Sequence, residues 1–278
     1  MIGYRNRTAL ITGASSGIGR AFAETLSSKG ANVILVARSK ARLDGLAAKI
    51  RTSYQVSAHV IVADLSREDG PRKVHEATRR LRRDVDILVN NAGFGTYGPF
   101  HTIPPGEDHD EIMLNVAAVV RLTHLFLPAM LERHTGIILN VASGAAFQAA
   151  PYMAVYGASK AFVLSFSEAL WAEYRGQGIS VLAVCPGPTD TGFFKVARNE
   201  DAVAGRKRSP QAVVDTALKA LDRGKSSAID GGLLRLGILS ERLVSRSIVA
   251  RSAAKIMAPR RAGKEKRFPR QGGAHGCP

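Results

Sequence analysis

Short apolar runs recur along the first 232 residues of the chain and alternate with longer stretches of mixed character. The runs lie at residues 8–12, 32–37, 57–63, 85–90, 136–142, 179–185 and 226–230. Most of them are apolar throughout instead of alternating apolar with polar residues, which is typical of strands that are covered on both faces. The pattern therefore predicts a parallel sheet between two layers of helices.

The stretches between the runs predict the helices of those layers. They lie at residues 17–29, 40–51, 72–82, 107–133, 151–175 and 210–222. Strands that alternate with helices in this way predict an α/β fold, a doubly wound parallel sheet of the Rossmann type. No repeat and no linker interrupts the chain before residue 232, so we expect a single domain over residues 1–232.

Two of the expected helices are apolar nearly all the way round. Residues 112–131 carry one formal charge, Arg121, and residues 161–172 carry one, Glu168. A helix that covers a sheet needs one apolar stripe, so a second apolar face favours another partner. We expect these helices to meet further copies of the chain in a homodimer or homotetramer; the alternative is an apolar surface without a partner.

The C-terminal part of the chain is strongly basic. The formal net charge is +16, and residues 233–278 account for +9 of it. Residues 233–258 predict a helical extension that is interrupted near Gly237, and residues 259–278, rich in Pro, Gly and basic residues, predict a disordered tail. Three interpretations of the extension stay open: a lid or subunit contact over the substrate pocket, peripheral attachment to anionic lipid, or a solvated segment without a role.

Cysteine and histidine usage argues against a disulfide framework or a metal site. The two cysteines are Cys185 and Cys277, and the seven histidines form no HExxH pattern. The first residues contain no apolar signal-peptide core, and the charge-free segment 136–159 divides into a strand, a loop and the start of a helix. We therefore expect a cytoplasmic protein in a reducing compartment, without a membrane span.

A glycine-rich turn, "TGASSGIG", follows the first strand and opens the first helix. Glycines allow a tight turn and let backbone N–H groups approach a phosphate, and the helix N-terminus adds free donors and a favourable dipole. Arg38 directly follows the second strand, at the place where a carboxylate would bind the ribose 2′-hydroxyl of NAD. Arg38 is suited instead to a 2′-phosphate, so we predict NADP(H) over NAD(H).

Tyr156 and Lys160, in "YGASK", lie four residues apart in a predicted helix and so share one face. A phenol beside a fixed ammonium is suited to moving a proton, because a neighbouring positive charge lowers the pKa of tyrosine. The Tyr-x-x-x-Lys pattern alone occurs by chance in many helices. The glycine-rich turn upstream of it favours the interpretation as a catalytic pair.

These motifs, in this order, resemble the short-chain dehydrogenase/reductase superfamily, in its branch with a TGxxxGxG turn and a YxxxK active site. The resemblance runs from about Thr8 to about Gly232 and implies a catalytic tetrad of Asn115, Ser143, Tyr156 and Lys160. It also implies a cofactor site built from the glycine-rich turn, from strand ends and from the segment "PGPTDT". The implied cofactor-binding residues are Gly13, Ser15, Ser16, Gly17, Ile18, Gly19, Arg38, Asp64, Leu65, Asn91, Ala92, Gly93, Tyr156, Lys160, Pro186, Gly187, Thr189 and Thr191.

The resemblance assigns a role to each catalytic residue. Tyr156 would act as general acid in carbonyl reduction and as base in the reverse direction, while Ser143 would stabilise the developing oxyanion. Lys160 would hold the nicotinamide ribose and lower the pKa of Tyr156, and Asn115 would position a water that connects Lys160 with solvent. Asp64 would bind the adenine, and Thr191 would contact the nicotinamide amide.

Aromatic residues in the expected substrate loops indicate an apolar pocket, although each could equally belong to the core. They are Phe94, Tyr97, Phe100, Phe147, Phe193 and Phe194. By analogy with relatives in the superfamily, we expect a ketosteroid, a 3-ketoacyl chain or a small ketone. The competing hypothesis is a regulatory protein without turnover that senses NADP or associates with nucleic acid or a membrane; no nucleic-acid recognition motif supports it.

Overall fold

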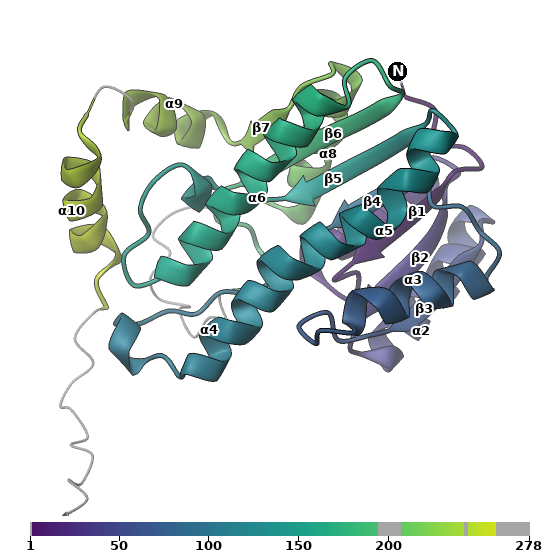
Figure 1. The fold of residues 1–278 in the computed structure, drawn as a ribbon, viewed down its shortest axis with the longest axis horizontal. Helices are drawn as coiled ribbons and strands as arrows, with labels where there is room; N and C mark the ends of the chain where they lie inside the picture. The colour runs from purple at the N-terminus through teal and green to yellow at the C-terminus, as the bar shows by residue number, and fades with distance from the viewer. Residues whose placement is uncertain (1, 194–206, 242–243, 260–278) are drawn as a thin grey trace, which may run out of the picture.

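The computed structural model describes residues 2–193, 207–241 and 244–259. Seven parallel strands form one sheet in the order β3-β2-β1-β4-β5-β6-β7, with helices on both faces (Figure 1). The strands are β1 (Thr8–Thr12), β2 (Asn32–Ala37), β3 (Ala58–Val62), β4 (Ile87–Asn90), β5 (Gly136–Val141), β6 (Ile179–Pro186) and β7 (Ser227–Asp230). The predicted doubly wound single domain is confirmed.

Three helices cover each face of the sheet. One layer consists of α1 (Gly17–Ser28), α2 (Lys40–Tyr54) and α8 (Pro210–Asp222), and the other of α3 (Gly70–Arg80), α5 (Ala118–Glu132) and α6 (Ala154–Glu173). The strands supply both cores because successive side chains point to opposite faces. Ala9 and Ile11 of β1 thus pack in the first core, and Leu10 packs in the second.

The predicted helix over residues 107–133 is continuous but not uniform. It comprises α4 (Pro105–Ile112), a π-helical turn η2 (Met113–Ala117) and α5. The π-helical turn contains Asn115, which is fully buried. Isolated π-helical turns inside α-helices often occur at functional sites, because they redirect one side chain. Here the turn directs Asn115 into the loop that follows β4.

The C-terminal extension forms two helices, α9 (Gly232–Glu241) and α10 (Arg246–Met257). The interruption that the sequence predicted near Gly237 is wrong in position, since α9 runs through Gly237 and ends at Glu241. Leu234 in α9 packs near Gly144 and Gly187, both close to the carboxyl end of the sheet. The predicted disordered tail lies almost wholly outside the described residues.

Candidate active site

The glycine-rich turn is held by the neighbouring strand end. Gly13 and Gly17 have φ values of +65° and +54°, which favour glycine, and a Cβ on Gly13 would lie 2.7 Å from Asn91 Nδ2. A Cβ on Gly19 would overlap the same amide nitrogen. The absence of side chains at these positions lets the backbone from Ser15 and Ser16 to Ile18 form an open cradle.

The cradle presents free donors to an anion. Ser16 is the N-cap of α1 and its side chain makes no capping hydrogen bond, and the first turn of α1 carries no acidic residue. The first N–H groups of a helix have no partner within the helix, and the dipole there favours negative charge. These residues therefore fit the phosphates of a dinucleotide.

The segment after β4 is fastened to the turn by Thr12 and Asn91. The backbone N–H groups of Asn91 and Ala92 donate to Thr12 Oγ1 at 2.9 and 3.0 Å, and Asn91 Nδ2 donates to the Thr12 carbonyl at 2.8 Å. The next residue, Gly93, leaves no room for a side chain, since a Cβ there would lie 2.9 Å from Asn115 Oδ1 and 3.3 Å from Lys160 Nζ. This segment thus joins the cofactor cradle to the expected tetrad.

Two strand ends present the residues expected to bind adenosine. Arg38, directly after β2, is exposed. Asp64, after β3, is partly buried, and its Oδ1 accepts hydrogen bonds from the backbone and side chain of Ser66 at 3.0 and 2.8 Å. This arrangement fixes the carboxylate and leaves Oδ2 for a ligand, while the neighbouring Leu65 is buried.

The four expected catalytic residues lie near the carboxyl ends of β4 and β5. Lys160 is buried in α6, and its Nζ donates to the carbonyl of Val141 at 2.9 Å. Asn115 exchanges two hydrogen bonds with the backbone of Phe94 and donates to Ser159 Oγ at 3.1 Å. Ser143 follows β5 and forms a hydrogen bond with Tyr156.

Burial controls the ionisation of the Tyr156–Lys160 pair. It raises the pKa of Tyr156 to about 12, and the hydrogen bond to Ser143 lowers it by less than burial raises it. Burial also lowers the pKa of Lys160 to about 8. Burial thus outweighs the other influences on Tyr156 in this structure. Lys160 Nζ lies 5.8 Å from the centroid of the Tyr156 ring, and the expected lowering of the Tyr156 pKa by Lys160 stays a prediction.

The segment after β6 forms the opposite wall. Pro186 ends the strand, Gly187 accepts a hydrogen bond from Thr189 Oγ1 at 2.9 Å, and the methyl group of Thr191 lies against Gly17 of the cradle. Phe193 then lies beside Tyr156, with ring centroids 5.1 Å apart. Thr191 thus connects this wall to the cofactor turn, and its contact with the nicotinamide amide stays a prediction; Phe194 lies outside the described residues.

Two residues near the tetrad, Gly95 and Glu111, were missed by reasoning from the sequence. Gly95 faces Tyr156, and a Cβ on it would lie 2.8 Å from Tyr156 Cδ2. Glu111 is completely buried and accepts two hydrogen bonds from Thr96. An acidic residue in a helix normally faces water, so only the position of Glu111 four residues before Asn115 could have pointed to it.

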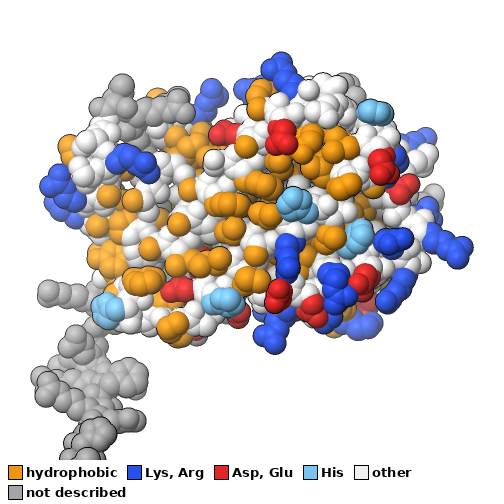
Figure 2. Space-filling model, viewed as in Figure 1, with side chains coloured by type: hydrophobic (Ala, Val, Ile, Leu, Met, Phe, Trp, Pro, Cys, Tyr) orange, Lys and Arg blue, Asp and Glu red, His pale blue; other side chains and the backbone are white. Residues whose placement is uncertain are grey.

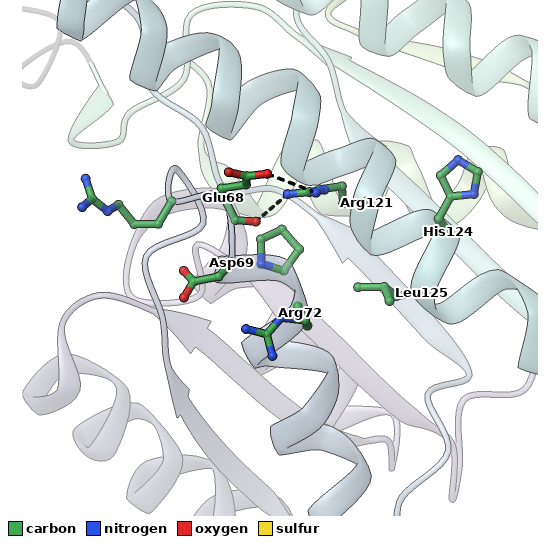
Figure 3. Close-up of a pocket in the computed structure, with 8 residues that line it drawn as sticks. Glu68, Asp69, Arg72, Arg121, His124 and Leu125 are labelled. Carbon is green, nitrogen blue, oxygen red and sulfur yellow. Dashed lines mark hydrogen bonds and ion pairs between the residues drawn. The ribbon is translucent and has the colours of Figure 1, made fainter.

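A groove of about 810 Å³ lies away from this site, between α3 and α5 (Figure 3). It is lined mainly by charged side chains, and Arg121 donates to the Glu68 carbonyl at 2.6 Å across it. None of the tetrad lines it. Within the described ranges no group of three or more His, Cys, Asp or Glu is placed to hold a metal ion.

One helix in the described part of the chain, Pro105–Glu132, is long and apolar enough to cross a membrane by length and composition alone. Its residues Val119, Leu122, Phe126 and Met130 are buried against the sheet and neighbouring helices. These buried residues account for one apolar side of the helix, and a core helix of a soluble protein passes the same test.

Comparison with known proteins supports the same family. Residues 7–202 match the family model described as short chain dehydrogenase. The chain is 40% identical over 195 residues to the very-long-chain 3-oxoacyl-CoA reductase of Anas platyrhynchos, which covers 68% of this chain and 62% of the relative. It is 38% identical over 190 residues to the human protein named inactive hydroxysteroid dehydrogenase-like protein 1, covering 67% and 57%.

Among solved structures, a short-chain dehydrogenase from Sphingobium yanoikuyae in complex with NADPH is 34% identical, with a TM-score of 0.77 over 95% of this chain and 100% of that one. The chain spans less than two thirds of the length of the duck and human relatives. The match to the family model nevertheless extends over most of the chain and includes the cradle and all four tetrad positions. This chain belongs to the short-chain dehydrogenase/reductase superfamily of oxidoreductases.

Proposed function

We propose that this protein is an NADP(H)-dependent oxidoreductase that transfers hydride between the nicotinamide and a carbonyl or secondary alcohol of an apolar substrate. The observation that carries the proposal is the convergence of Asn115, Ser143, Tyr156 and Lys160 near a glycine-rich turn that opens a helix. The preference for NADP(H) rests on Arg38, an exposed guanidinium after β2.

The geometry suits the reducing direction. The bound cofactor supplies the hydride. Because the pKa of Tyr156 is raised to about 12, its phenol is protonated near neutral pH and can donate to the developing alkoxide. Ser143 lies within hydrogen-bonding reach of the Tyr156 hydroxyl and can stabilise the same oxygen. Lys160 would bind the ribose hydroxyls, and Asn115 holds the loop that carries Gly93 in place.

An apolar substrate is supported by the side chains around Tyr156. Phe193 lies beside its ring, and Leu234 of α9 lies 3.0 Å from where a Cβ of Gly144 would be. Tyr97 and Tyr152 lie near each other, with ring centroids 6.4 Å apart. A 3-ketoacyl chain or a ketosteroid would fit such walls, in line with the names of the duck and human relatives.

The test is NADPH consumption by the full-length protein on short ketones and aldehydes, ketosteroids and 3-ketoacyl thioesters. Turnover on one class, lost in Tyr156→Phe while that variant still binds NADPH, would support the proposal. A wild-type k_cat in Tyr156→Phe would refute the role of Tyr156. Tight NADPH binding without turnover on any class would favour a sensor, the alternative that the human relative with "inactive" in its name keeps open.

Two further associations belong to this proposal. The apolar face of α5 and α6 is proposed as the contact in a homodimer or homotetramer. The extension carries the exposed apolar side chains Leu236 and Ile256, beside Arg246, Arg251 and Lys255. This combination suits a cytoplasmic protein that attaches peripherally to anionic lipid. Loss of sedimentation with anionic liposomes after deletion of residues 233–278 would support that attachment, and no sedimentation of the full chain would contradict it.

A further inference from the structure

Glu111 is a buried acid that the proposed mechanism does not use. It lies in the last turn of α4, four residues before Asn115, and its side chain is 0% exposed. Its Oε2 accepts hydrogen bonds from Thr96 N and Thr96 Oγ1, both at 2.9 Å, while its Oε1 has no hydrogen-bond partner among the described residues. A buried carboxylate with an unpaired oxygen costs several kcal/mol unless it is protonated, so this group is suited to holding a proton.

Thr96 connects Glu111 with the surface. The same hydroxyl that donates to Glu111 lies 3.4 Å from Asp108 Oδ1, and Asp108 is partly exposed on α4. A hydroxyl is one donor and also an acceptor, so it can receive a proton on one side while it releases its own on the other. Asp108, Thr96 and Glu111 therefore form a continuous line from solvent to a buried site.

The inner end of this line acts electrostatically on the catalytic pair. Glu111 and Lys160 influence each other's ionisation, and the charge of Glu111 also raises the pKa of Tyr156. Thr96 follows Gly93 by three residues, and Gly93 lies between Asn115 Oδ1 and Lys160 Nζ. The titratable groups that act on Glu111 are Asp108 of its own helix and Lys160 of α6. Burial raises the pKa of Glu111 to about 7, so near neutral pH this carboxyl group can both take up and release a proton.

Resting on the oxidoreductase function proposed above, we propose that Asp108, Thr96 and Glu111 are a proton inlet that reloads the Lys160–Tyr156 pair from solvent. Each carbonyl reduction consumes the phenolic proton of Tyr156. Asp108 relays a proton from water to Thr96 Oγ1, which releases its own to Glu111 Oε2. Glu111 then gives up one proton toward the catalytic pair and returns to the carboxylate, and Asp108 takes a new proton from water.

The rival role for Glu111 is purely structural, as an acceptor that holds the backbone of Thr96. Glu111→Gln separates the two, because an amide oxygen can accept the same two hydrogen bonds but cannot carry the exchangeable acid proton. Thr96→Val removes the hydroxyl at nearly constant volume, and Thr96→Ser restores it. Asp110→Asn is the matched control for Asp108→Asn, since Asp110 is exposed on the same helix.

The first measurement is infrared spectroscopy of the full-length protein after a rapid drop in pH, which needs no turnover. We expect a carboxylic-acid band that titrates near neutral pH and is lost in Glu111→Gln. It should appear at least about tenfold more slowly in Thr96→Val and Asp108→Asn, and at the wild-type rate in Thr96→Ser and Asp110→Asn. A band that persists in Glu111→Gln, or that forms at the wild-type rate in Thr96→Val, would overturn the inlet.

The second measurement is the pH profile of NADPH-dependent reduction. We expect k_cat of the wild type to fall as the pH rises through the pKa of Glu111, because the donor loses its proton. In Glu111→Gln the fall of kcat with rising pH should disappear, and kcat should be at least about tenfold lower than in the wild type. The Kd for NADPH should be unchanged. A Glu111→Gln variant with the kcat and the pH profile of the wild type would contradict the proposed inlet. A wild-type protein without turnover would count against the proposed function only. The infrared rates would still show whether protons reach Glu111 through Asp108 and Thr96.

Discussion

The tetrad depends on a residue without a side chain. Gly95 packs against both Tyr156 and Phe193, and a Cβ on it would lie 2.8 Å from one ring and 3.0 Å from the other. Both atoms belong to rings, so an added methyl group would displace the Tyr156 phenol, the Phe193 ring or the loop itself. The loop after β4 therefore helps to position Tyr156, the proposed general acid.

We predict that Gly95→Ala lowers k_cat/KM for carbonyl reduction at least about tenfold, because a displacement of about 1 Å at a reacting group can cost ~10²-fold. The matched control is Gly45→Ala in α2, where no atom lies within 4 Å of the added Cβ. That substitution should stabilise the helix by about 0.5–1 kcal/mol and leave the kinetics unchanged. Wild-type kinetics in Gly95→Ala would show that Tyr156 is positioned without this loop.

Arg38 is the residue to which we assign the proposed preference for NADP(H). A charge-assisted hydrogen bond contributes about 1.5–3 kcal/mol, so Arg38→Ala should weaken NADPH binding by about tenfold to a hundredfold and change NADH binding little. Fluorescence titration with each cofactor gives both constants. Arg223→Ala removes the same charge at the C-terminal end of α8, at the opposite edge of the sheet, and should change neither. An equal loss for NADH and NADPH would contradict the assignment of Arg38 to the 2′-phosphate.

Among the elements, α10 is joined by a hydrogen bond to the loop after β4, the loop that also carries Gly93 and Gly95. Tyr97 Oη donates to the Met257 carbonyl at 2.7 Å, which connects the loop after β4 to the end of α10. Figure 1 shows α9 and α10 extending away from the sheet, so this contact bridges back to its body.

We predict that Tyr97→Phe loosens α10 without unfolding the domain. Hydrogen exchange in residues 246–257 should accelerate, while the Tm changes by no more than a few degrees, because one hydrogen bond contributes about 1 kcal/mol. Tyr152→Phe is the control, since its ring lies beside that of Tyr97 but the Met257 contact stays intact. Unchanged exchange in Tyr97→Phe would mean that α10 is held by other contacts.

Sequence reasoning located the regular elements because their apolar runs have to be buried wherever they occur. The strand predicted at residues 179–185 is found at Ile179–Pro186, and the helix predicted at 40–51 is extended only to Tyr54. The π-helical turn at Asn115 has no comparable signal, because it depends on hydrogen bonds to Phe94, a partner 21 residues away. Glu111 and the pKa of Tyr156 were missed for the same reason: both follow from burial that only the assembled fold creates.

For the whole molecule, the buried acid makes stability depend on pH. Glu111 has its pKa raised from 4.5 to about 7 in the folded state. Between these values the folded protein binds more protons than the unfolded chain, so its stability falls as the pH rises through this window. Lys160 acts in a separate window, above its lowered pKa of about 8, where rising pH removes the cost of burying its charge.

We predict that the free energy of unfolding, measured with urea at pH 5, 6 and 7, falls with rising pH by up to about 3 kcal/mol because of Glu111. This value corresponds to about 1.4 kcal/mol for each pKa unit. Glu111→Gln should flatten this slope whatever its effect on absolute stability. Glu132→Gln, at the exposed end of α5, should keep the slope. An unchanged slope in Glu111→Gln would show that the carboxyl group ionises alike in the folded and unfolded states.

The outer face of α5 and α6 is the surface that we propose for subunit contact. Apolar side chains gather over this face (Figure 2). On α6 the rings of Phe162 and Phe166 stack with centroids 5.7 Å apart. Phe162 is 40% exposed although Lys160, two residues earlier, is buried. Two residues correspond to about 200° of helical rotation, so one side of α6 carries the catalytic lysine and the opposite side offers an aromatic surface. An exposed apolar face of this kind favours a second subunit over water.

We therefore predict that the wild type has the mass of a dimer or tetramer by light scattering at micromolar concentration, and that Phe162→Asp shifts it toward the monomer. An introduced carboxylate would have to be buried without a partner in the assembled form. Val62→Asp is the control, because Val62 is also exposed but lies on β3 at the far edge of the sheet. Cofactor binding should survive in the monomeric variant, since the cradle and the tetrad come from one chain. A wild-type mass that stays monomeric at every concentration would instead leave this face to a different partner.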